Sequence, residues 1–403
     1  MIVVVGAGAA GLAAAIFARS SGGDVLLLER TSDGGRKILI SGGGRCNILP
    51  SSLHPERFVT HSPPHLMRGL LRSWPLQAQR AFFEDEVGIP LALEEETGKL
   101  FPVSNKARDV RDGLMALARA RGVEVQTQTT VTNLRPAGAP GVRWLLETSR
   151  GDIQASSVIL ATGGLSVPLT GSDGTGLSIA RQLGHDMHAT YPALTPLTGS
   201  TPLLASLSGI SLDVRIRAKW QGHTTESRGG FLFTHRGYSG PSVLDVSHVA
   251  VRNPGAVLRV QWTDRDAEEW TRDLMSTQGL VINLVARYMP ERLAEVLCLE
   301  AGLPPDRRGP ELRRQERTAL VEALTAYALP WSGDEGYKKA EVTGGGVALT
   351  EVHPRTLESV QHPGLFLCGE MLDAFGPIGG YNFAWAWGTG RAAGLGAATR
   401  TAQ

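Results

Sequence analysis

Near its amino terminus the chain carries a glycine pattern that few folds can accommodate. The segment Gly6-Ala7-Gly8-Ala9-Ala10-Gly11 matches G-x-G-x-x-G, follows an apolar, β-branched run at 2–5 and opens an alanine-rich, helix-favouring stretch at 11–20. Glu29 ends the next apolar run, eighteen residues after Gly11. This strand–turn–helix–strand order predicts a Rossmann-like unit that binds a dinucleotide at the helix N-terminus.

Each residue of this turn has a predicted task. Gly6 permits the tight turn, Gly8 lets the backbone approach a pyrophosphate, and Gly11 lets the helix pack closely on the strand. Ala9 and Ala10 lie in the first helical turn, where free N–H groups and the helix dipole favour anions. We therefore expect all five residues to surround the phosphates.

The acid at the end of the second strand limits which dinucleotide can bind. Glu29 can accept hydrogen bonds from ribose hydroxyls and disfavours a 2′-phosphate, so the turn predicts FAD or NAD rather than NADP. Arg30, next to it, is expected to contact the same ligand. Residues 36–47 form a second glycine-rich loop for which a simple NAD site has no need, and this loop favours FAD. Its predicted FAD contacts are Arg36, Lys37, Ser41, Gly42, Gly44, Arg45, Cys46 and Asn47.

Two later segments resemble the ends of strands in flavin sites. The apolar run at 158–160 leads into Ala161-Thr162-Gly163, where small residues let the chain pass a cofactor, and the glycine-rich stretch at 171–176 is expected to complete the surroundings of FAD. The run at 364–368 leads into Gly369-Glu370 and then Asp373. Either acid is a candidate to bind the ribityl chain, and we favour Asp373.

A glycine turn then precedes an Ala/Trp-rich helix. Gly379, Gly380, Tyr381 and Asn382 are expected to lie at the flavin, with the helix N-terminus facing its pyrimidine edge. The positive end of the helix dipole would stabilise the negative charge that develops there on reduction.

The distribution of glycine-rich, strand-like and helix-like segments along the chain predicts an α/β FAD domain of the Rossmann-like, glutathione-reductase type that is split in sequence. Residues 1–190 and 336–403 share the glycine-rich, strand-and-helix character of this domain. Residues 191–263 contain prolines and alternating apolar residues that indicate an inserted β-rich, barrel-like domain. Residues 264–335 are charge-rich and indicate a small helical domain.

Seven motifs, taken in order, resemble a known family. They are GAGAAGLAAA at Gly6, GRKILISGGGRCN at Gly35, LFPVSNKA at Leu100, LATGGLSVPLTGSDGTG at Leu160, FTHRGYSGP at Phe233, KKAEVTGGGV at Lys338 and GEMLDAFGPIGGYN at Gly369. Together they resemble the bacterial FAD-dependent oxidoreductases of the bile-acid dehydro-reductase and aminoacetone oxidase-like group, within the two-dinucleotide-binding-domain flavoproteins. The resemblance implies an FAD fold with an inserted barrel, and a backbone contact from Val131 to the adenine.

Candidates for catalysis are fewer. The expected reaction is hydride transfer through flavin N5, so a proton donor and a substrate clamp are needed. His235 lies in the glycine-rich loop FTHRGYSGP and is a candidate general acid, with a loop-shaping role as the alternative. Tyr381 and Arg45 lie within flavin motifs and are candidates to polarise a substrate carbonyl, while packing is the alternative for Tyr381. We expect no metal site at His185, Asp186 and His188.

Composition bounds the partners. The 40 Lys and Arg balance 39 Asp and Glu, and the net charge of +1 predicts neither a nucleic-acid partner nor a membrane partner. Three widely spaced cysteines without C-x-x-C indicate a reducing compartment, and the chain is expected to be cytoplasmic. Nothing in the sequence predicts the oligomeric state.

We therefore expect an FAD-dependent reductase of a conjugated ketone or enone, a small molecule, with NAD(P)H as a transient reductant. The alternatives are an amine oxidase and an FAD-binding protein of nucleic-acid modification. A broad basic patch on the inserted domains would favour the latter.

Overall fold

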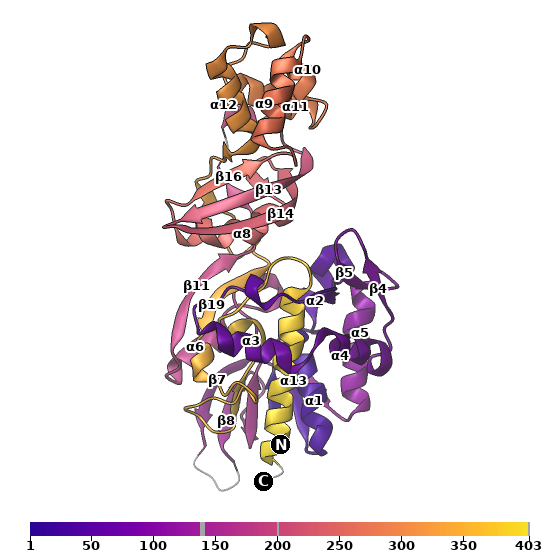
Figure 1. Cartoon of the computed structure of the whole chain (residues 1–403). Coiled ribbons are helices and arrows are strands. Elements are labelled where there is room, and N and C mark those ends of the chain that lie inside the picture. Colours follow the sequence, from indigo (N-terminus) through magenta and orange to yellow (C-terminus); the bar gives the residue numbers. More distant parts are fainter. Residues whose placement is uncertain (138–141, 200, 402–403) are drawn as a thin grey trace. The chain divides into compact units, whose positions relative to one another are not determined.

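The computed structural model describes residues 1–137, 142–199 and 201–401, so the predicted segments that contain 138–141, 200 and 402–403 lie partly outside the described residues. The chain forms two compact units (Figure 1). Unit 1 contains Met1–Tyr191 and Glu341–Gln403, and unit 2 contains Pro192–Ala340. Each has its own hydrophobic core. The finer division of the inserted residues at 263/264 stays a prediction.

A five-stranded parallel sheet lies at the centre of unit 1. Its order is β20 (Leu365–Leu367), β10 (Ser157–Leu160), β1 (Ile2–Val5), β2 (Val25–Leu28) and β6 (Glu124–Gln126). The residues of β1, β2, β10 and β20 are buried throughout, as expected for a sheet covered on both faces. The pairing joins strands from both ends of the chain, which confirms the predicted α/β, Rossmann-like class.

Small residues hold the two main helices of unit 1 against each other. Helix α1 (Ala9–Ala18) packs along α13 (Tyr381–Thr401), the two being neighbours over most of the length of α1 (Figure 1). A Cβ at Gly390 would lie 2.3 Å from the Ala10 carbonyl oxygen, and one at Gly394 would lie 2.4 Å from that of Ala14. Only glycine permits such close backbones. The other helices of unit 1 are α2 (Arg36–Ile40), α3 (Pro64–Ser73), α4 (Leu76–Ala81), α5 (Ala107–Ala120) and α6 (Thr175–Gln182).

Three small sheets complete unit 1. One joins β3 (Leu49–Pro50), β5 (Lys99–Pro102) and β4 (Leu91–Glu94), and another joins β7 (Val131–Pro136), β8 (Trp144–Thr148) and β9 (Ile153–Ala155). The third pairs β11 (Met187–Ala193) with β19 (Val342–Val347).

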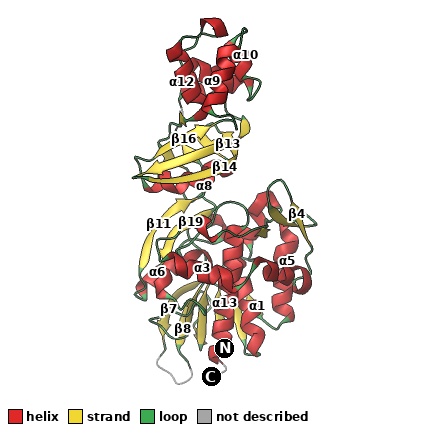
Figure 2. Cartoon of the chain, in the orientation of Figure 1, coloured by secondary structure: helices red, strands yellow, loops and turns green. Residues whose placement is uncertain are grey.

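Unit 2 is built on a seven-stranded sheet (Figure 2). The order is β17 (Tyr327–Ala328), β16 (Val257–Gln261), β13 (Ser211–Trp220), β14 (His223–Phe233), β15 (Gly237–Ser239), β12 (Leu197–Thr198) and β18 (Gly333–Asp334). Helix α8 (Pro241–Arg252) packs on β13 and β14. The remaining helices are α7 (Pro202–Ala205), α9 (Ala267–Ser276), α10 (Val281–Val285), α11 (Glu291–Glu300) and α12 (Arg314–Thr325).

Local predictions fail where tertiary contacts compete with propensity. The alternating residues at 123–131 predict one strand, but β6 ends at Gln126 and β7 begins at Val131, with Gln128 at a φ of 53° between them. Ser104 is a plausible N-cap and predicts a helix start there, but α5 starts at Ala107. The sequence at 63–120 predicts mainly helix, but this segment also contains the β4–β5 hairpin. Within the described residues, no helix combines the length and apolarity needed to cross a bilayer.

Candidate active site

A cavity of about 570 Å³ opens at the carboxyl ends of β1, β2 and β10, where ligands bind in doubly wound sheets. All of its wall belongs to unit 1. The predicted cofactor contacts that line it are Gly6, Gly8, Ala9, Ala10, Glu29, Arg30, Arg36, Lys37, Ser41, Gly42, Arg45, Asn47, Val131, Ala161, Thr162, Gly163, Glu370, Gly379, Gly380 and Asn382. Five segments distant in sequence therefore share one cavity.

The first glycine turn has the geometry that its pattern predicts. Gly6 has a φ of +102°, and a Cβ there would lie 2.6 Å from the Ala161 carbonyl oxygen. A Cβ at Gly11 would lie 1.7 Å from the carbonyl oxygen of Gly6, so Gly11 tightens the turn from within and does not line the cavity. Gly8 precedes α1 and has open space where a Cβ would stand. The N-terminus of α1 is thus accessible to an anion.

Glu29 is held at the cavity edge by backbone donors. Its Oε2 accepts from Ala7 N at 2.8 Å, and its Oε1 accepts from Thr31 N at 2.8 Å and Thr31 Oγ1 at 2.7 Å. An ionised carboxylate has about four acceptor positions, so one remains for a ribose hydroxyl. Arg30 lies beside it and forms an ion pair with Asp173, which also lines the cavity.

The second glycine loop curls along the wall in a left-handed backbone. Gly42, Gly43 and Gly44 have φ values of 56°, 66° and 85°, and Cys46 has 61°. The Asn47 amide, oriented to satisfy both neighbours, donates to the Leu49 carbonyl at 3.1 Å and accepts from Gly380 N at 2.9 Å. This pair ties the loop to the turn that precedes α13.

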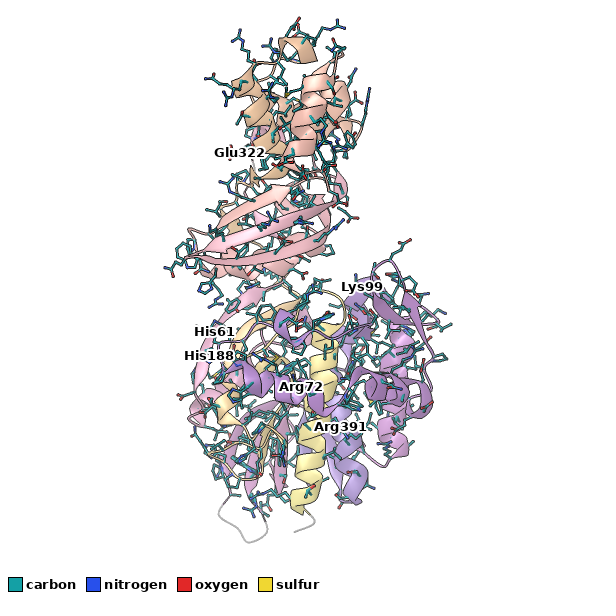
Figure 3. The ribbon with its side chains drawn as sticks, in the orientation of Figure 1. His61, Arg72, Lys99, His188, Glu322 and Arg391 are labelled. Carbon is teal, nitrogen blue, oxygen red and sulfur yellow. The ribbon has the colours of Figure 1, made fainter. Side chains whose placement is uncertain are left out.

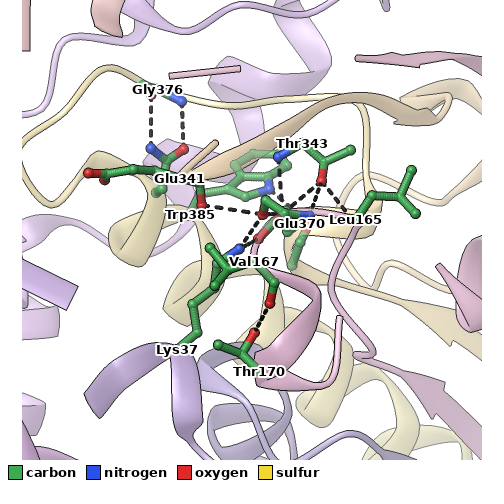
Figure 4. Close-up of polar contacts among 12 residues, drawn as sticks. Lys37, Leu165, Val167, Thr170, Glu341, Thr343, Glu370, Gly376 and Trp385 are labelled. Atoms are coloured by element: carbon green, nitrogen blue, oxygen red, sulfur yellow. Dashed lines mark hydrogen bonds and ion pairs between the residues drawn. The ribbon is translucent and has the colours of Figure 1, made fainter. Parts of the chain in front are cut away.

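The two basic residues at the start of this loop, Arg36 and Lys37, have partners that the sequence did not reveal. Arg36 binds Asp33 Oδ1 at 2.8 Å and Ser32 Oγ at 3.2 Å, so its charge is already compensated within its own turn. Lys37 reaches across the cavity wall to Glu370 Oε2 at 2.5 Å (Figure 4). Both residues also line the cavity, and their contact with FAD stays a prediction.

Glu370 accepts hydrogen bonds on both of its carboxylate oxygens. Its Oε1 accepts from Thr343 N at 3.0 Å, from Thr343 Oγ1 at 2.9 Å and from Ser166 Oγ at 2.5 Å (Figure 4 shows the Thr343 bonds). Leu165 N in turn donates to Thr343 Oγ1 at 2.7 Å. With Lys37 on Oε2, the carboxylate is fixed in position and retains acceptor capacity on that oxygen.

Asp373, the acid that we favoured, faces elsewhere. It does not line the cavity, is 1% exposed, and accepts from Ser62 N, Ser62 Oγ and His61 N at 2.8–2.9 Å. Burial by itself would raise the pKa of Asp373, but hydrogen bonds from His61 and Ser62 outweigh it and lower the pKa. Asp373 anchors the loop at 60–62, so Glu370 replaces it as the acid of the cavity.

Asp373 also belongs to a cluster with His61 and His188. Figure 3 labels the two histidines of this cluster. His61 Nδ1 lies 3.1 Å from Asp373 Oδ1, His188 Nε2 lies 3.6 Å from Oδ2, and the two imidazoles stack at 5.1 Å. The three side chains are close enough to share a metal ion, which neither the predicted absence of a metal nor the motif at His185 anticipated. However, Asp373 Oδ2 already accepts four hydrogen bonds. The donors are Thr60 Oγ1, His61 N, Ser62 N and Ser62 Oγ, so the lone pairs of this oxygen are largely used.

The turn before α13 closes the cavity. The Asn382 amide accepts from Gly376 N and donates to the Gly376 carbonyl, both at 2.9 Å (Figure 4). A Cβ at Gly380, where φ is +91°, would lie 2.6 Å from the Leu49 carbonyl carbon. Phe383, Trp385 and Ala386 of α13 complete this wall. The N-terminus of α13 therefore lies at the cavity, and its position at the pyrimidine edge of the flavin stays a prediction.

Several predicted site residues lie off the wall. Tyr381 is buried, accepts a hydrogen bond from Arg57 Nη1 at 3.3 Å and packs on Phe58, which is the packing role considered as its alternative. Cys46 is fully buried, and burial raises the pKa of its thiol to about 12. Gly44 and Gly369 belong to the backbone behind the wall.

The catalytic candidates separate between the two units. Arg45 lines the cavity, where its guanidinium lies 4.0 Å from the centre of the Phe101 ring and 3.0 Å from Glu94 Oε1. His235 is exposed on the turn between β14 and β15 of unit 2 and is not a wall residue. Its role as a general acid stays a prediction.

Some wall residues were missed by sequence reasoning. Thr129 and Thr130 follow β6, and Lys99 and Phe101 come from β5. Phe101 belongs to the motif LFPVSNKA of the family resemblance, which is the signal for this wall, whereas Lys99 lies just before the motif. The threonines carry no motif, and their position follows from the end of β6 at the sheet edge.

The cavity fits FAD. Gly8 leaves open space in front of the N-terminus of α1, and two fixed carboxylates, Glu29 and Glu370, lie on the wall. Among the described residues, the buried Thr162 Oγ1 on the same wall has no hydrogen-bond partner within the protein, which leaves it for a bound ligand or an ordered water. A parallel Rossmann-like sheet with this site defines an FAD-dependent oxidoreductase.

Comparisons with known proteins agree with this class of enzyme. The family model "HI0933-like protein Rossmann domain" matches residues 1–396, and the chain belongs to this family. A ribosomal RNA dihydrouridine synthase of Escherichia coli is 34% identical over 96% of this chain and 94% of its own, and one of Haemophilus influenzae is 32% identical over 98% and 97%. A 3-dehydro-bile acid delta(4,6)-reductase of Clostridium scindens is 30% identical over 99% of both chains.

A solved structure supports the fold alone. The 3-ketosteroid-delta4-(5alpha)-dehydrogenase of Rhodococcus jostii superposes with a TM-score of 0.52 at 18% identity, covering 98% of this chain and 96% of its own.

Proposed function

We propose that this enzyme reduces the C5–C6 double bond of a uracil ring in ribosomal RNA to give dihydrouridine. The observation that carries the proposal is the similarity, along nearly the whole chain, to two ribosomal RNA dihydrouridine synthases at 34% and 32% identity. This departs from the expectation that no nucleic acid is bound, which rested on overall net charge alone.

The chemistry is shared with the other relative. Both a uracil ring and a delta(4,6) bile-acid ketone contain a carbon–carbon double bond conjugated to a carbonyl. Saturation adds a hydride to the β-carbon and a proton to the α-carbon. FAD in its reduced form supplies the hydride from N5. The sequence-based expectation of an enone reductase thus extends to uracil, whose C4 carbonyl activates the ring.

The chain's own residues contribute charge and position. Arg45 and Lys99 line the cavity, and Lys99 lies next to the Gly379–Gly380 turn, where a Cβ at Gly379 would be 3.7 Å from Lys99 Cε. These two cations and the N-terminus of α13 would stabilise negative charge that develops on the substrate carbonyl and the flavin. Glu29 and Glu370 would hold the ribose and ribityl hydroxyls.

NAD(P)H is the proposed source of electrons. The sequence has no second glycine fingerprint after a fresh strand, so the reduced nicotinamide would bind transiently and leave after hydride transfer to FAD. Anaerobic mixing with NADH or NADPH should bleach the oxidised-flavin absorbance, and a flavin that neither nucleotide reduces would exclude this route.

The test uses purified enzyme, NADPH and ribosomal RNA from a strain that lacks dihydrouridine in this RNA. Nuclease digestion and mass spectrometry should find dihydrouridine at a defined position, with none in reactions that lack FAD or NADPH. An Arg45→Gln, Lys99→Gln enzyme, assayed at saturating FAD, should lose about tenfold or more in turnover. An enzyme with reducible flavin that leaves the RNA unchanged would contradict the proposal.

The same assay decides a second candidate. The bile-acid reductase at 30% identity favours a steroid enone as substrate. If a 3-oxo-4,6-diene steroid is reduced and the RNA is not, the steroid function is the correct one. The amine-oxidase alternative finds no counterpart among the three relatives described above.

A further inference from the structure

One face of the unit 2 sheet concentrates basic side chains. Strand residues alternate between the two faces, and Arg215, Arg217 and Lys219 of β13 lie on the same face. The intervening Val214, Ile216 and Ala218 are buried, and α8 packs on β13 and β14. The arginine side chains on the open face are 35% exposed at Arg215 and 51% exposed at Arg217.

Neighbouring strands add two more arginines in register. Arg228 of β14 pairs directly with Arg215, and Arg259 of β16 pairs directly with Arg217. We call these five residues, Arg215, Arg217, Lys219, Arg228 and Arg259, the basic face. Like charges directly opposite each other destabilise a sheet, so folding gains nothing from these two pairs. Their arrangement points to an external anion.

Acidic residues compensate the basic face only in part. On the face itself Glu226 lies 2.6 Å from Arg217 Nε and 3.5 Å from Arg215 Nε, and Asp213 is a β13 residue of the same parity. At the rim Asp264 pairs with Arg228 at 2.7 Å, and Glu322 pairs with Arg259 at 3.4 Å. The side chains of these ion pairs are 35–76% exposed, so the pairs contribute little to stability and a polyanion can displace them.

We propose that the basic face binds the phosphate backbone of the ribosomal RNA substrate. Arg215, Arg217 and Lys219 alternate along one strand, which spaces their side chains by about 7 Å and makes a row of cations rather than a single anion pocket. Thr224 and Gln261, opposite Lys219 and Arg215, add hydrogen-bonding groups to the same face. The proposal rests on the function proposed above and assigns its RNA-docking surface.

The physical reason for such a surface lies in the charge balance. The whole chain has a net charge of only +1, so long-range attraction cannot concentrate RNA on this enzyme. A local row of cations supplies affinity through phosphate contacts and counter-ion release, without reading sequence. Selection of the uridine would remain with the cavity in unit 1.

The test neutralises three members of the basic face in the full-length FAD enzyme. Arg217→Gln, Lys219→Gln, Arg259→Gln should weaken binding of an rRNA fragment, followed by fluorescence anisotropy, by about tenfold or more at moderate salt. The slope of log affinity against log salt should fall by about two to three, because each lost phosphate contact removes nearly one unit. KM for RNA should rise while flavin reduction by NADPH stays at the wild-type rate.

Two matched controls keep the result interpretable. Arg68→Gln, Arg72→Gln, Arg119→Gln removes three exposed cations from unit 1 and should leave RNA affinity within about twofold. Arg217→Lys, Arg259→Lys keeps the charge and should retain most of the affinity and the salt slope. Flavin absorbance and the melting temperature report whether each variant is folded.

The outcomes separate this inference from the proposed function. If the wild-type enzyme makes dihydrouridine in rRNA and the neutralised variant binds and reduces that RNA equally well, the basic face is not the docking surface. If both triple variants lose affinity equally, the effect is one of net charge and the inference is likewise wrong. A wild-type enzyme that neither binds nor reduces rRNA overturns the proposed function itself, and the docking surface with it.

Discussion

At the scale of single residues, the site depends on two kinds of glycine. Gly8 and Gly43 leave open space on or beside the cavity wall, whereas Gly6, Gly11 and Gly380 each have another part of the backbone within 2.6 Å of where a Cβ would stand. The first kind admits a ligand and the second kind brings segments together. Both kinds are needed because a dinucleotide is bound mainly through backbone groups.

Gly380 offers a direct test of this second kind. Gly380→Val would place a β-branched residue at a φ of +91° and push it against Leu49 and Pro50, at a cost of roughly 1–3 kcal/mol. We expect FAD affinity to fall about tenfold or the flavin potential to shift, as measured by fluorescence titration and spectroelectrochemistry. Gly388→Ala, on the same helix with open space around its Cβ, is the control and should change neither value. Unchanged values for Gly380→Val would contradict the placement of α13 at the flavin.

At the scale of elements, the packing of α1 on α13 joins the two sequence segments of the split domain. The two helices come from opposite ends of the chain, and glycine and alanine on both let their backbones approach closely. Because both N-termini meet the cavity wall, at Gly8–Ala10 and at Asn382–Phe383, their packing also sets the width of the site. Stability and cofactor binding are therefore coupled through this one contact.

Gly394→Leu tests that coupling. A Cβ at Gly394 would lie 2.4 Å from the Ala14 carbonyl oxygen and 3.0 Å from Ala18 N, so the helices must separate. We expect the free energy of unfolding, from urea titration, to fall by about 1–3 kcal/mol or more. Gly69→Ala in α3, where nothing lies near the added Cβ, should instead raise it by roughly 0.5–1 kcal/mol. Equal stability of the Gly394→Leu protein and wild type would show that the contact is looser than described.

At the scale of the whole molecule, the predicted cofactor site belongs to one of the two units. The cavity wall is drawn from unit 1 alone, and unit 2 has its own aromatic core around Phe231, Phe233 and Trp262. Under the proposed function, unit 1 carries the chemistry and unit 2 carries the basic face for RNA.

Removal of FAD should reveal this division in calorimetry. A ligand present at a hundred times its Kd stabilises the unit that binds it by about 2.7 kcal/mol. We expect two unfolding transitions, of which only one moves up when FAD is restored to the apoprotein. Gly380→Val should show a smaller shift at the same FAD concentration. If both transitions move together, the two units unfold as one and the division does not hold thermodynamically.

Glu370 and Asp373 show what the sequence could and could not predict about the site. The motif at 364–373 predicted an acid at the flavin, but both residues satisfied the pattern. The choice depends on Lys37, Ser166 and Thr343, which fix Glu370, and on the loop at 60–62, which takes Asp373. The register that sets Arg215 opposite Arg228 is likewise invisible along a single strand.

The sequence by itself determined the glycine turn, the acid at Glu29, the α/β class and FAD, because each of these follows from local patterns of glycine, charge and hydrophobic periodicity. Only the tertiary structure decided which acid faces the cavity, that Tyr381 packs on Phe58 rather than facing the cavity, and that five cations share one sheet face. Those outcomes depend on contacts between segments up to 333 residues apart, such as that of Lys37 with Glu370, and such contacts are set by packing and strand register, which local patterns do not encode.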